Sequence, residues 1–171
     1  MIMKKNTHES KLYNKILLLS RNKLFYTELN FKDSFQNRIN LIFLHLSFLF
    51  IKIKQEINNK HFKSFYQRMF DFTFNQIEAN MREIGYSDTT VSKNMKFLVK
   101  SFYNILLNSE KFNLITDDQK IYFLLNYLKV NNDKKVNNNA ILIEYFDKYY
   151  AFCLDLSSDK VLKGDLNFTY K

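Results

Sequence analysis

The sequence of 171 residues has no proline and no tryptophan, two glycines and one cysteine. All-β sandwiches and glycine-rich phosphate loops need frequent Gly and Pro residues at their turns, so the composition disfavours both and favours long helices with few interruptions. The single cysteine, Cys153, cannot form an intramolecular disulfide. It lies in an apolar helical stretch, where a free thiol behaves as a small hydrophobic side chain, and we expect a reducing compartment.

Residues for catalysis or metal binding are scarce as well. The histidines, His8, His45 and His61, fall in different predicted elements, and none has a cysteine or second histidine at ligand spacing. This disfavours a zinc site, and no nucleophile motif, dinucleotide fingerprint or Walker loop is present, so we expect no metal, no cofactor and no enzymatic activity. His45 alone lies on an apolar helix. A catalytic base at this position would need an open polar pocket that contains a partner carboxylate. A structural histidine, buried and hydrogen-bonded to a neighbouring carboxylate, is the commoner case.

Signals for export or membrane insertion are also missing. Residues 1–15 lack the apolar core of a secretory signal, and no arginine precedes Arg21, unlike in a mitochondrial transit peptide. The most apolar segment, 41–51, is interrupted by His45 and Ser47 and is shorter than the ~20 apolar residues that a spanning helix needs. We expect a bacterial cytoplasmic protein that can also lie peripherally on the inner membrane.

Positive charge is concentrated at the N-terminal end. The net charge is +9, from 26 Lys and Arg against 17 Asp and Glu, and residues 1–63 hold 12 of the basic and 4 of the acidic side chains. Such a region would attract the phosphates of nucleic acid, of ribosomal RNA or of anionic lipid. A genome rich in A and T would give the same excess through AAA and AAT codons without any function, because most of the basic residues are lysine and asparagine is abundant.

Hydrophobic periodicity predicts an all-α protein, a single compact bundle of about six helices in one domain of residues 1–171. The expected helices are 9–29, 34–58, 60–84, 88–106, a fifth opened by a Thr116 to Gln119 capping box, and 140–156. Asp33 or Ser34 can cap the second helix, whose broad apolar arc predicts a central position. Gly85 can close the third in the left-handed conformation, and Ser87 or Asp88 can start the fourth. We expect a polar loop at 131–139, one short turn at 157–164 and a tail at 165–171.

Two surfaces could carry a function. Lys93, Lys96 and Lys100 recur at helical spacing and form one basic stripe, for which a solvated face is the simpler interpretation. Aromatic residues are abundant, with 18 Phe and 11 Tyr. Most must lie in the interior, but an exposed subset would form a groove for an apolar segment of another protein.

A DNA-reading helix-turn-helix is an alternative interpretation of residues 76–94, because a glycine lies in the turn and Thr-Thr-Val-Ser follows. Close contact of the two helices needs a small residue four positions before the glycine and an apolar one nine positions after it. Met81 and Asn94 occupy these positions, but Met81 is not small and Asn94 is not apolar. We therefore expect no sequence-specific binding to nucleic acid.

The turn around Gly85 belongs to a longer and more specific pattern. It reads Met81-Arg82-Glu83-Ile84-Gly85-Tyr86-Ser87-Asp88 and continues with Val91, Lys93, Met95, Lys96 and the pair Phe102-Tyr103. Upstream, Arg21, the pair Phe25-Tyr26, Leu29, Asp33, Arg38 and His45 follow in a matching order. In order and spacing these residues resemble the signature of the bacterial ubiquinol-cytochrome c chaperone family, and the resemblance spans nearly the whole chain.

The resemblance implies an all-helical, non-catalytic chaperone that assists assembly of the respiratory cytochrome bc complex and binds newly made cytochrome b close to the ribosome and the inner membrane. Asp88 is expected to cap the fourth helix while Arg82 pairs with a carboxylate, and Asp33 and Arg38 are expected to act alike at the second helix. The candidate client-binding or motif residues are Arg21, Phe25, Tyr26, Asp33, Arg38, His45, Arg82, Glu83, Gly85, Asp88, Lys93, Phe102 and Tyr103, and the candidate phosphate or lipid surface is Lys93, Lys96 and Lys100. Structural pinning is the simpler role for the charged residues at the turns, and direct client contact is the alternative.

Overall fold

The computed structural model describes residues 7–56, 58–131 and 138–170, and within them it is all-α, as predicted. The α-helices are α1 (His8–Ser20), α2 (Phe35–Gln55), α3 (Lys60–Ile84), α4 (Asp88–Ser109), α5 (Asp117–Tyr127), α6 (Asn139–Asp155) and α7 (Ser158–Leu162). A π-helical turn, η1 (Leu24–Glu28), follows α1, and a 3-10 turn, η2 (Phe112–Leu114), precedes α5. The short turn expected at 157–164 contains α7.

Polar residues at the helix starts explain where most helices begin. The side chains of Thr7, Ser34, Asn59, Ser87, Thr116 and Asn138 each accept a hydrogen bond from a backbone N–H in the first turn of the following helix. The predicted capping box of Thr116 and Gln119 is present. At the other end of α3, Gly85 adopts the left-handed conformation with φ 99°, as the sequence predicted.

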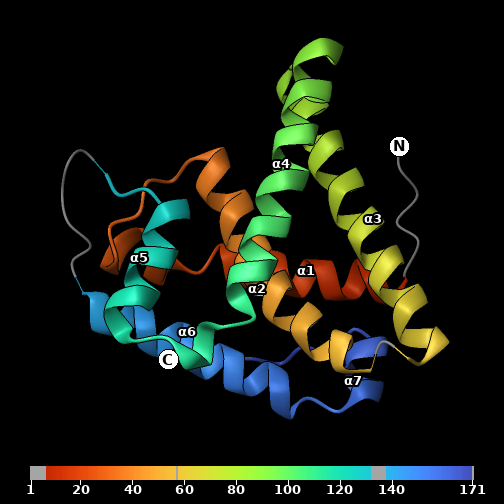
Figure 1. Ribbon diagram of the computed structural model, residues 1–171. Coiled ribbons are helices and arrows are strands. Elements are labelled where there is room, and N and C mark those ends of the chain that lie inside the picture. Colours follow the sequence, from red (N-terminus) through yellow and green to blue (C-terminus); the bar gives the residue numbers. More distant parts are fainter. Residues whose placement is uncertain (1–6, 57, 132–137, 171) are drawn as a thin grey trace.

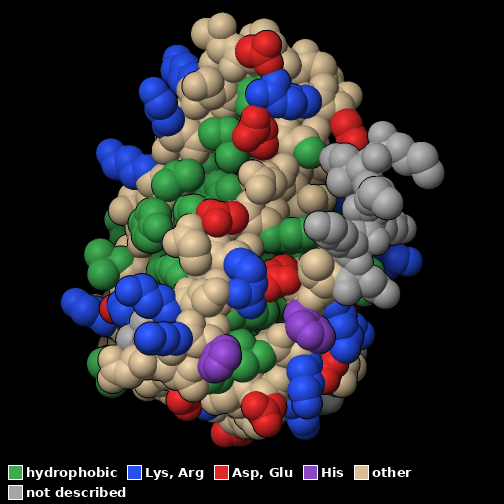
Figure 2. All heavy atoms as spheres, turned by 90° about the vertical axis from the view of Figure 1, so that its right-hand side faces the viewer, with side chains coloured by type: hydrophobic (Ala, Val, Ile, Leu, Met, Phe, Trp, Pro, Cys, Tyr) green, Lys and Arg blue, Asp and Glu red, His purple; other side chains and the backbone are tan. Residues whose placement is uncertain are grey.

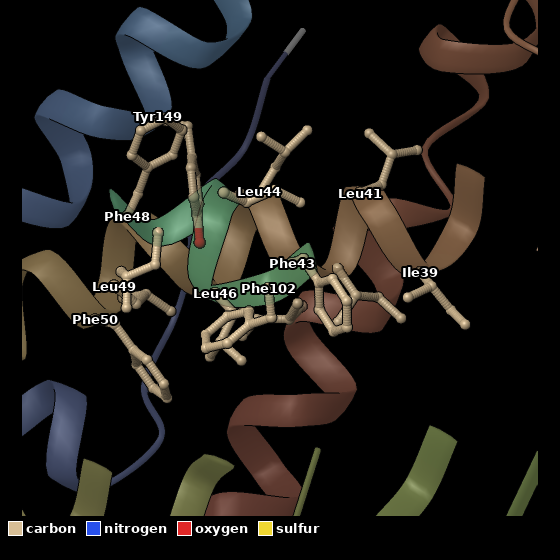
Figure 3. Packing of buried hydrophobic residues seen from close by; sticks show 14 of the residues in the cluster. Ile39, Leu41, Phe43, Leu44, Leu46, Phe48, Leu49, Phe50, Phe102 and Tyr149 are labelled. Atoms are coloured by element: carbon tan, nitrogen blue, oxygen red, sulfur yellow. The ribbon is translucent and has the colours of Figure 1, made fainter. Parts of the chain in front are cut away.

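Helix α2 lies at the centre of the molecule, as predicted, and packs against α1, α3, α4, α6 and α7 (Figure 1). Every residue from Leu41 to Ile51 is buried. Figure 3 shows Phe48 beside Tyr149 of α6 on one side of α2, and Phe43 and Phe50 on another side near Phe102 of α4. A helix that is apolar all round is stable only when protein surrounds it, and the other helices provide that surrounding. No helix in the described residues has the length and hydropathy needed to cross a membrane.

The first helix is shorter than predicted. It was expected to run to residue 29, but α1 ends at Ser20 and the chain turns before η1. Local polar groups stabilise this end, because the Tyr26 hydroxyl donates to the Ser20 carbonyl at 2.8 Å and the Asn22 side chain accepts from the Leu24 N–H at 3.0 Å. The spacing of apolar residues alone did not predict this break, because Phe25 is buried after the break just as it would be in a continuous helix.

The last residues are not a free tail but pack against the body. Leu166 is buried, and the Phe168 ring lies 5.1 Å from the ring of Tyr149 and 5.3 Å from that of Phe152. Asp165 forms an ion pair with Lys11 of α1. The C-terminal segment thereby holds α1 against α6. The loop expected at 131–139 lies mostly outside the described residues.

The two glycines allow a matched test of this packing. Both have positive φ, but a Cβ on Gly85 would meet nothing within 4 Å, whereas one on Gly164 would lie 2.5 Å from the His8 carbonyl oxygen. We expect Gly85→Ala to lower the free energy of unfolding by about 1 kcal/mol through backbone strain, and Gly164→Ala by about 3 kcal/mol because α1 must also move. Urea unfolding followed by circular dichroism measures both. Equal losses would show that the close contact with α1 contributes nothing.

Candidate functional site

A pocket of about 210 Å³ opens where α1, α2 and α3 meet. Its inner wall is apolar and includes Tyr13 of α1, Ile42 of α2 and Ile77 of α3, all of which are buried. Its mouth is charged, with Arg21, Arg38 and Glu83 contributed by three separate segments. The pocket thus joins a hydrophobic interior to a mouth that carries both signs of charge.

Three of the predicted site residues, Arg21, Arg38 and Glu83, therefore come together at this mouth although they are far apart in the sequence. Asp33 holds Arg38 in place by two hydrogen bonds, Nε to Oδ1 at 2.6 Å and Nη2 to Oδ2 at 2.9 Å. The bond from Arg38 lowers the pKa of Asp33 and in turn raises the pKa of Arg38. This confirms the expected pairing, but Ser34 and not Asp33 caps α2.

Arg82 braces the turn between α3 and α4, as predicted. Its guanidinium donates to Glu78 at 2.8 Å and also to Asp88 across the turn. The expected cap at Asp88 is wrong, because the Ser87 hydroxyl accepts the bond from the Thr90 N–H and Asp88 is left to pair with Arg82. Hydrogen bonds to both carboxylates raise the pKa of Arg82.

Apolar side chains continue outward from the pocket. Ile84, at its mouth, is 60% exposed, and Tyr86 beyond Gly85 is 40% exposed. The Tyr86 ring lies 6.4 Å from that of Phe35, which also lines the pocket and joins the turn to the start of α2. Leu17 of α1, which is half-buried, also lines the pocket. Large exposed apolar side chains gathered around a cavity are typical of a protein-binding surface.

Tyr13, which sequence reasoning missed, is the most unusual group in the pocket. Its side chain is buried, and its hydroxyl has no hydrogen-bond partner among the described residues. Burial raises its pKa, against the opposing effect of the Arg21 charge, so the hydroxyl stays protonated at neutral pH. A buried hydroxyl without a partner costs free energy, and such a group in a native structure calls for an explanation.

Two of the aromatic residues proposed for client binding or as part of the motif lie in the interior and not on the surface. Phe25 and Phe102 are fully buried. Phe102 packs against Phe43 at 5.2 Å, and Phe25 packs against Tyr145 at 4.9 Å. Both rings therefore support the interior around α2, where no other protein can reach them. Of their neighbours in sequence, Tyr26 is half-buried and Tyr103 is 47% exposed.

His45 does not form the polar pocket that an enzyme would require. It is fully buried, its Nδ1–H donates to the Leu41 carbonyl at 2.6 Å, and its Nε2 accepts from the Tyr145 hydroxyl at 2.7 Å. Its partners are thus a backbone carbonyl and a phenol, not the carboxylate expected. Burial lowers the pKa of His45 to about 4, so the ring is neutral at pH 7.

The predicted basic stripe lies on the exposed side of α4. Lys93, Lys96 and Lys100 are all exposed and form no ion pair within the described residues. Phe97 and Leu107 of the same helix are more than 60% exposed. In Figure 2, hydrophobic side chains gather on the flank where α3 and α4 pack, below a row of basic side chains. The described residues contain no group of three His, Cys, Asp or Glu side chains that could hold a metal ion.

The comparisons with known proteins agree with the resemblance seen in the sequence. Residues 27–168 match the family described as ubiquinol-cytochrome C chaperone. The chain belongs to this family. The family supports a role as a non-catalytic assembly factor for the cytochrome bc complex. The match begins after Arg21, Phe25 and Tyr26, whose place in the family pattern stays a prediction.

The fold is also that of a solved structure. The crystal structure of the Cbp3 homolog from Brucella abortus matches with a TM-score of 0.79 at 21% sequence identity, covering 95% of this chain and 89% of the other. At that identity the likeness shows the fold alone. No curated protein matches the sequence.

The helix-turn-helix alternative does not fit the geometry of this chaperone fold. That motif joins two short helices that cross at roughly 90–120° near the turn. Here α3 has 25 residues and α4 has 22, and the two pair lengthwise, with the ring of Phe70 5.7 Å from that of Tyr103. Figure 1 shows them as a long hairpin.

The buried histidine predicts a pH dependence of stability. His45 has a pKa of about 4 when folded and ~6.5 when unfolded, so the unfolded chain takes up a proton first as the pH falls. Stability should fall between pH 6.5 and pH 4 by about 3 kcal/mol and then lose nothing more from this group. Urea unfolding across that range, compared with His45→Gln, isolates the effect. The prediction fails if both proteins lose stability equally.

Proposed function

We propose that this chain is an assembly chaperone for the cytochrome bc complex that binds newly made cytochrome b at the pocket between α1, α2 and α3. The family match supports the role in assembly. We choose this surface for one reason. Around a single apolar pocket lie Arg21, Arg38 and Glu83, and exposed Ile84 lies at its mouth. A membrane protein that has not yet inserted exposes apolar side chains, and a concave apolar site covers them until insertion.

The braces around the pocket fit such a role. Asp33 fixes Arg38 on one wall, and Arg82 fixes the Gly85 turn that positions Ile84 and Tyr86. A binding site that is held in shape before the partner arrives loses less conformational entropy on binding. Structural pinning and client contact are therefore complementary roles of the same motif.

We place contact with a phosphate-rich surface, of the ribosome or of the anionic inner membrane, on α4 and not on the N-terminal third. Several basic side chains of the N-terminal third are paired with carboxylates, Lys11 with Asp165, Arg38 with Asp33 and Lys54 with Glu110. Ion pairing leaves less free charge there than the sequence count suggests. The three lysines of α4 are exposed and remain available to phosphates.

The proposed client site can be blocked at one position. Asn80 is exposed and lines the mouth, so Asn80→Arg should fill it without disturbing the interior. We expect roughly tenfold less cytochrome b to copurify with the tagged variant from respiring cells, and less assembled bc complex in a strain that carries only this variant. Asn75→Arg is the matched control, because Asn75 is exposed on the same helix outside the pocket. Normal recovery of cytochrome b with both variants would contradict the proposal.

The basic stripe has a separate test. Replacing Lys93, Lys96 and Lys100 together by Gln should weaken binding to purified ribosomes or to anionic vesicles by roughly tenfold or more, with a smaller salt dependence. A triple replacement of the exposed Lys111, Lys129 and Lys163 removes the same charge elsewhere and should have little effect. Comparing ribosomes with vesicles identifies which surface is bound. Equal losses in the two triple variants would mean that only net charge matters.

A further inference from the structure

Two hydrogen-bond donors that line the pocket have no side-chain partner among the described residues. The Tyr13 hydroxyl is unpartnered within the described part of the chain, and its side chain is only 4% exposed. Arg21, which lines the same pocket, forms no ion pair with any described residue, and its charge acts on the Tyr13 hydroxyl. Tyr13 lies on α1 at the pocket wall, and Arg21, the residue directly after α1, lies at the mouth. A neutral donor and a cation that line the same pocket suit a carboxylate.

The size of the pocket limits what can enter it. A volume of about 210 Å³ is below the ~300 Å³ at which pockets for small molecules begin. The space suits a single large side chain, and the walls that would contact it, Ile39, Ile42 and Ile77, are apolar. Buried apolar anchors of this kind dominate many protein interfaces.

We propose that the pocket recognises a client segment in which one large apolar residue is followed by Asp or Glu. The apolar side chain enters the pocket against Ile42 and Ile77. The carboxylate accepts hydrogen bonds from the Tyr13 hydroxyl and the Arg21 guanidinium. This inference rests on the proposed function and adds the chemistry by which the client is chosen.

The flanks of the mouth favour a continuous segment over a chain end or a lipid. Apolar side chains lie on two sides of the pocket, half-buried Leu17 of α1 on one side and exposed Ile84 with Tyr86 at the end of α3 on the other. A chain that passes across the mouth contacts both sides, whereas a chain terminus would contact only one. Two acyl chains of a lipid exceed the volume of the pocket. Glu83, on the α3 side of the mouth, would repel the client carboxylate, which limits the acidic residue to the side of Arg21.

The test uses a short fluorescent peptide, amidated at its C-terminus, with a central Leu-Asp pair in a Gly and Ser background. Fluorescence anisotropy measures its affinity for the full chain beside peptides with Leu-Asn or Ala-Asp instead. We expect the Leu-Asp peptide to bind about tenfold more tightly than either. Tyr13→Phe and Arg21→Gln should each remove most of the preference for Asp over Asn and keep the preference for Leu over Ala. Glu83→Gln should tighten binding of the Leu-Asp peptide.

Stability separates this role from a structural one. Tyr13→Phe removes a hydroxyl that has no partner among the described residues, so its unfolding free energy should be unchanged or higher while its peptide affinity falls. Tyr122→Phe and Lys23→Gln are the matched controls, because both positions are exposed and lie outside the pocket.

The inference is overturned if the Leu-Asp and Leu-Asn peptides bind equally, if none binds, or if Tyr13→Phe binds like the unchanged protein. It is also overturned if only anionic vesicles are bound and the pocket variants reduce that binding. A loss of cytochrome b recovery in Asn80→Arg without any preference for Asp would reject this inference alone. A preference for Asp with normal cytochrome b recovery in Asn80→Arg would keep the peptide site and reject the proposed function.

Discussion

The complete burial of α2 is the constraint on which the rest of the structure depends. Eleven consecutive residues, Leu41 to Ile51, are buried, so apolar surface must be supplied on every side of one helix. Such a helix also carries polar groups into the interior, and these need partners there. His45 bonds to Leu41 and Tyr145, and the buried Asn37 side chain bonds to the backbone of Lys32 and of Lys129. The bonds to Tyr145 and to the backbone of Lys129 tie α2 to α6 and to the segment after α5.

This demand uses most of the aromatic residues of the chain and thereby restricts where a partner protein can bind. Rings from α3, α4 and α6 pack against α2, as Phe74, Phe102 and Tyr149 do. An abundance of aromatic residues therefore indicates a large interior more than a wide binding surface. The apolar side chains that remain exposed lie mainly around the pocket mouth and on α4 and α5, which makes the candidate site small and its composition specific.

Features that depend on neighbours in sequence could be predicted, and features that depend on distant contacts could not. The fold class, the Gly85 turn and the Thr116 capping box follow from local chemistry and periodicity. The packing of Phe168 and the partners of Phe25 depend on which helices meet, and an apolar stripe does not carry that information. The end of α1 at Ser20 was missed because the bond from Tyr26 that holds it forms only once the chain has turned. For Tyr13 a weak signal existed, since a hydroxyl on the apolar face of α1 is unusual. Only the three-dimensional structure shows that Tyr13 lines a pocket together with residues of α2 and α3.

The distribution of charge also differs between the count along the sequence and the folded protein. Counted along the sequence, the N-terminal third is strongly basic, but Lys11 and Lys54 pair with the acidic residues Asp165 and Glu110 of distant segments. Exposed pairs of this kind stabilise the fold only slightly, yet they neutralise the local field. Arg21 has no such partner among the described residues and stands at the one pocket that also holds an unpartnered buried hydroxyl. Because Arg38 at the same mouth is already paired with Asp33, a client carboxylate that reaches this point is attracted mainly by Arg21, and Glu83 limits where along the mouth it can bind.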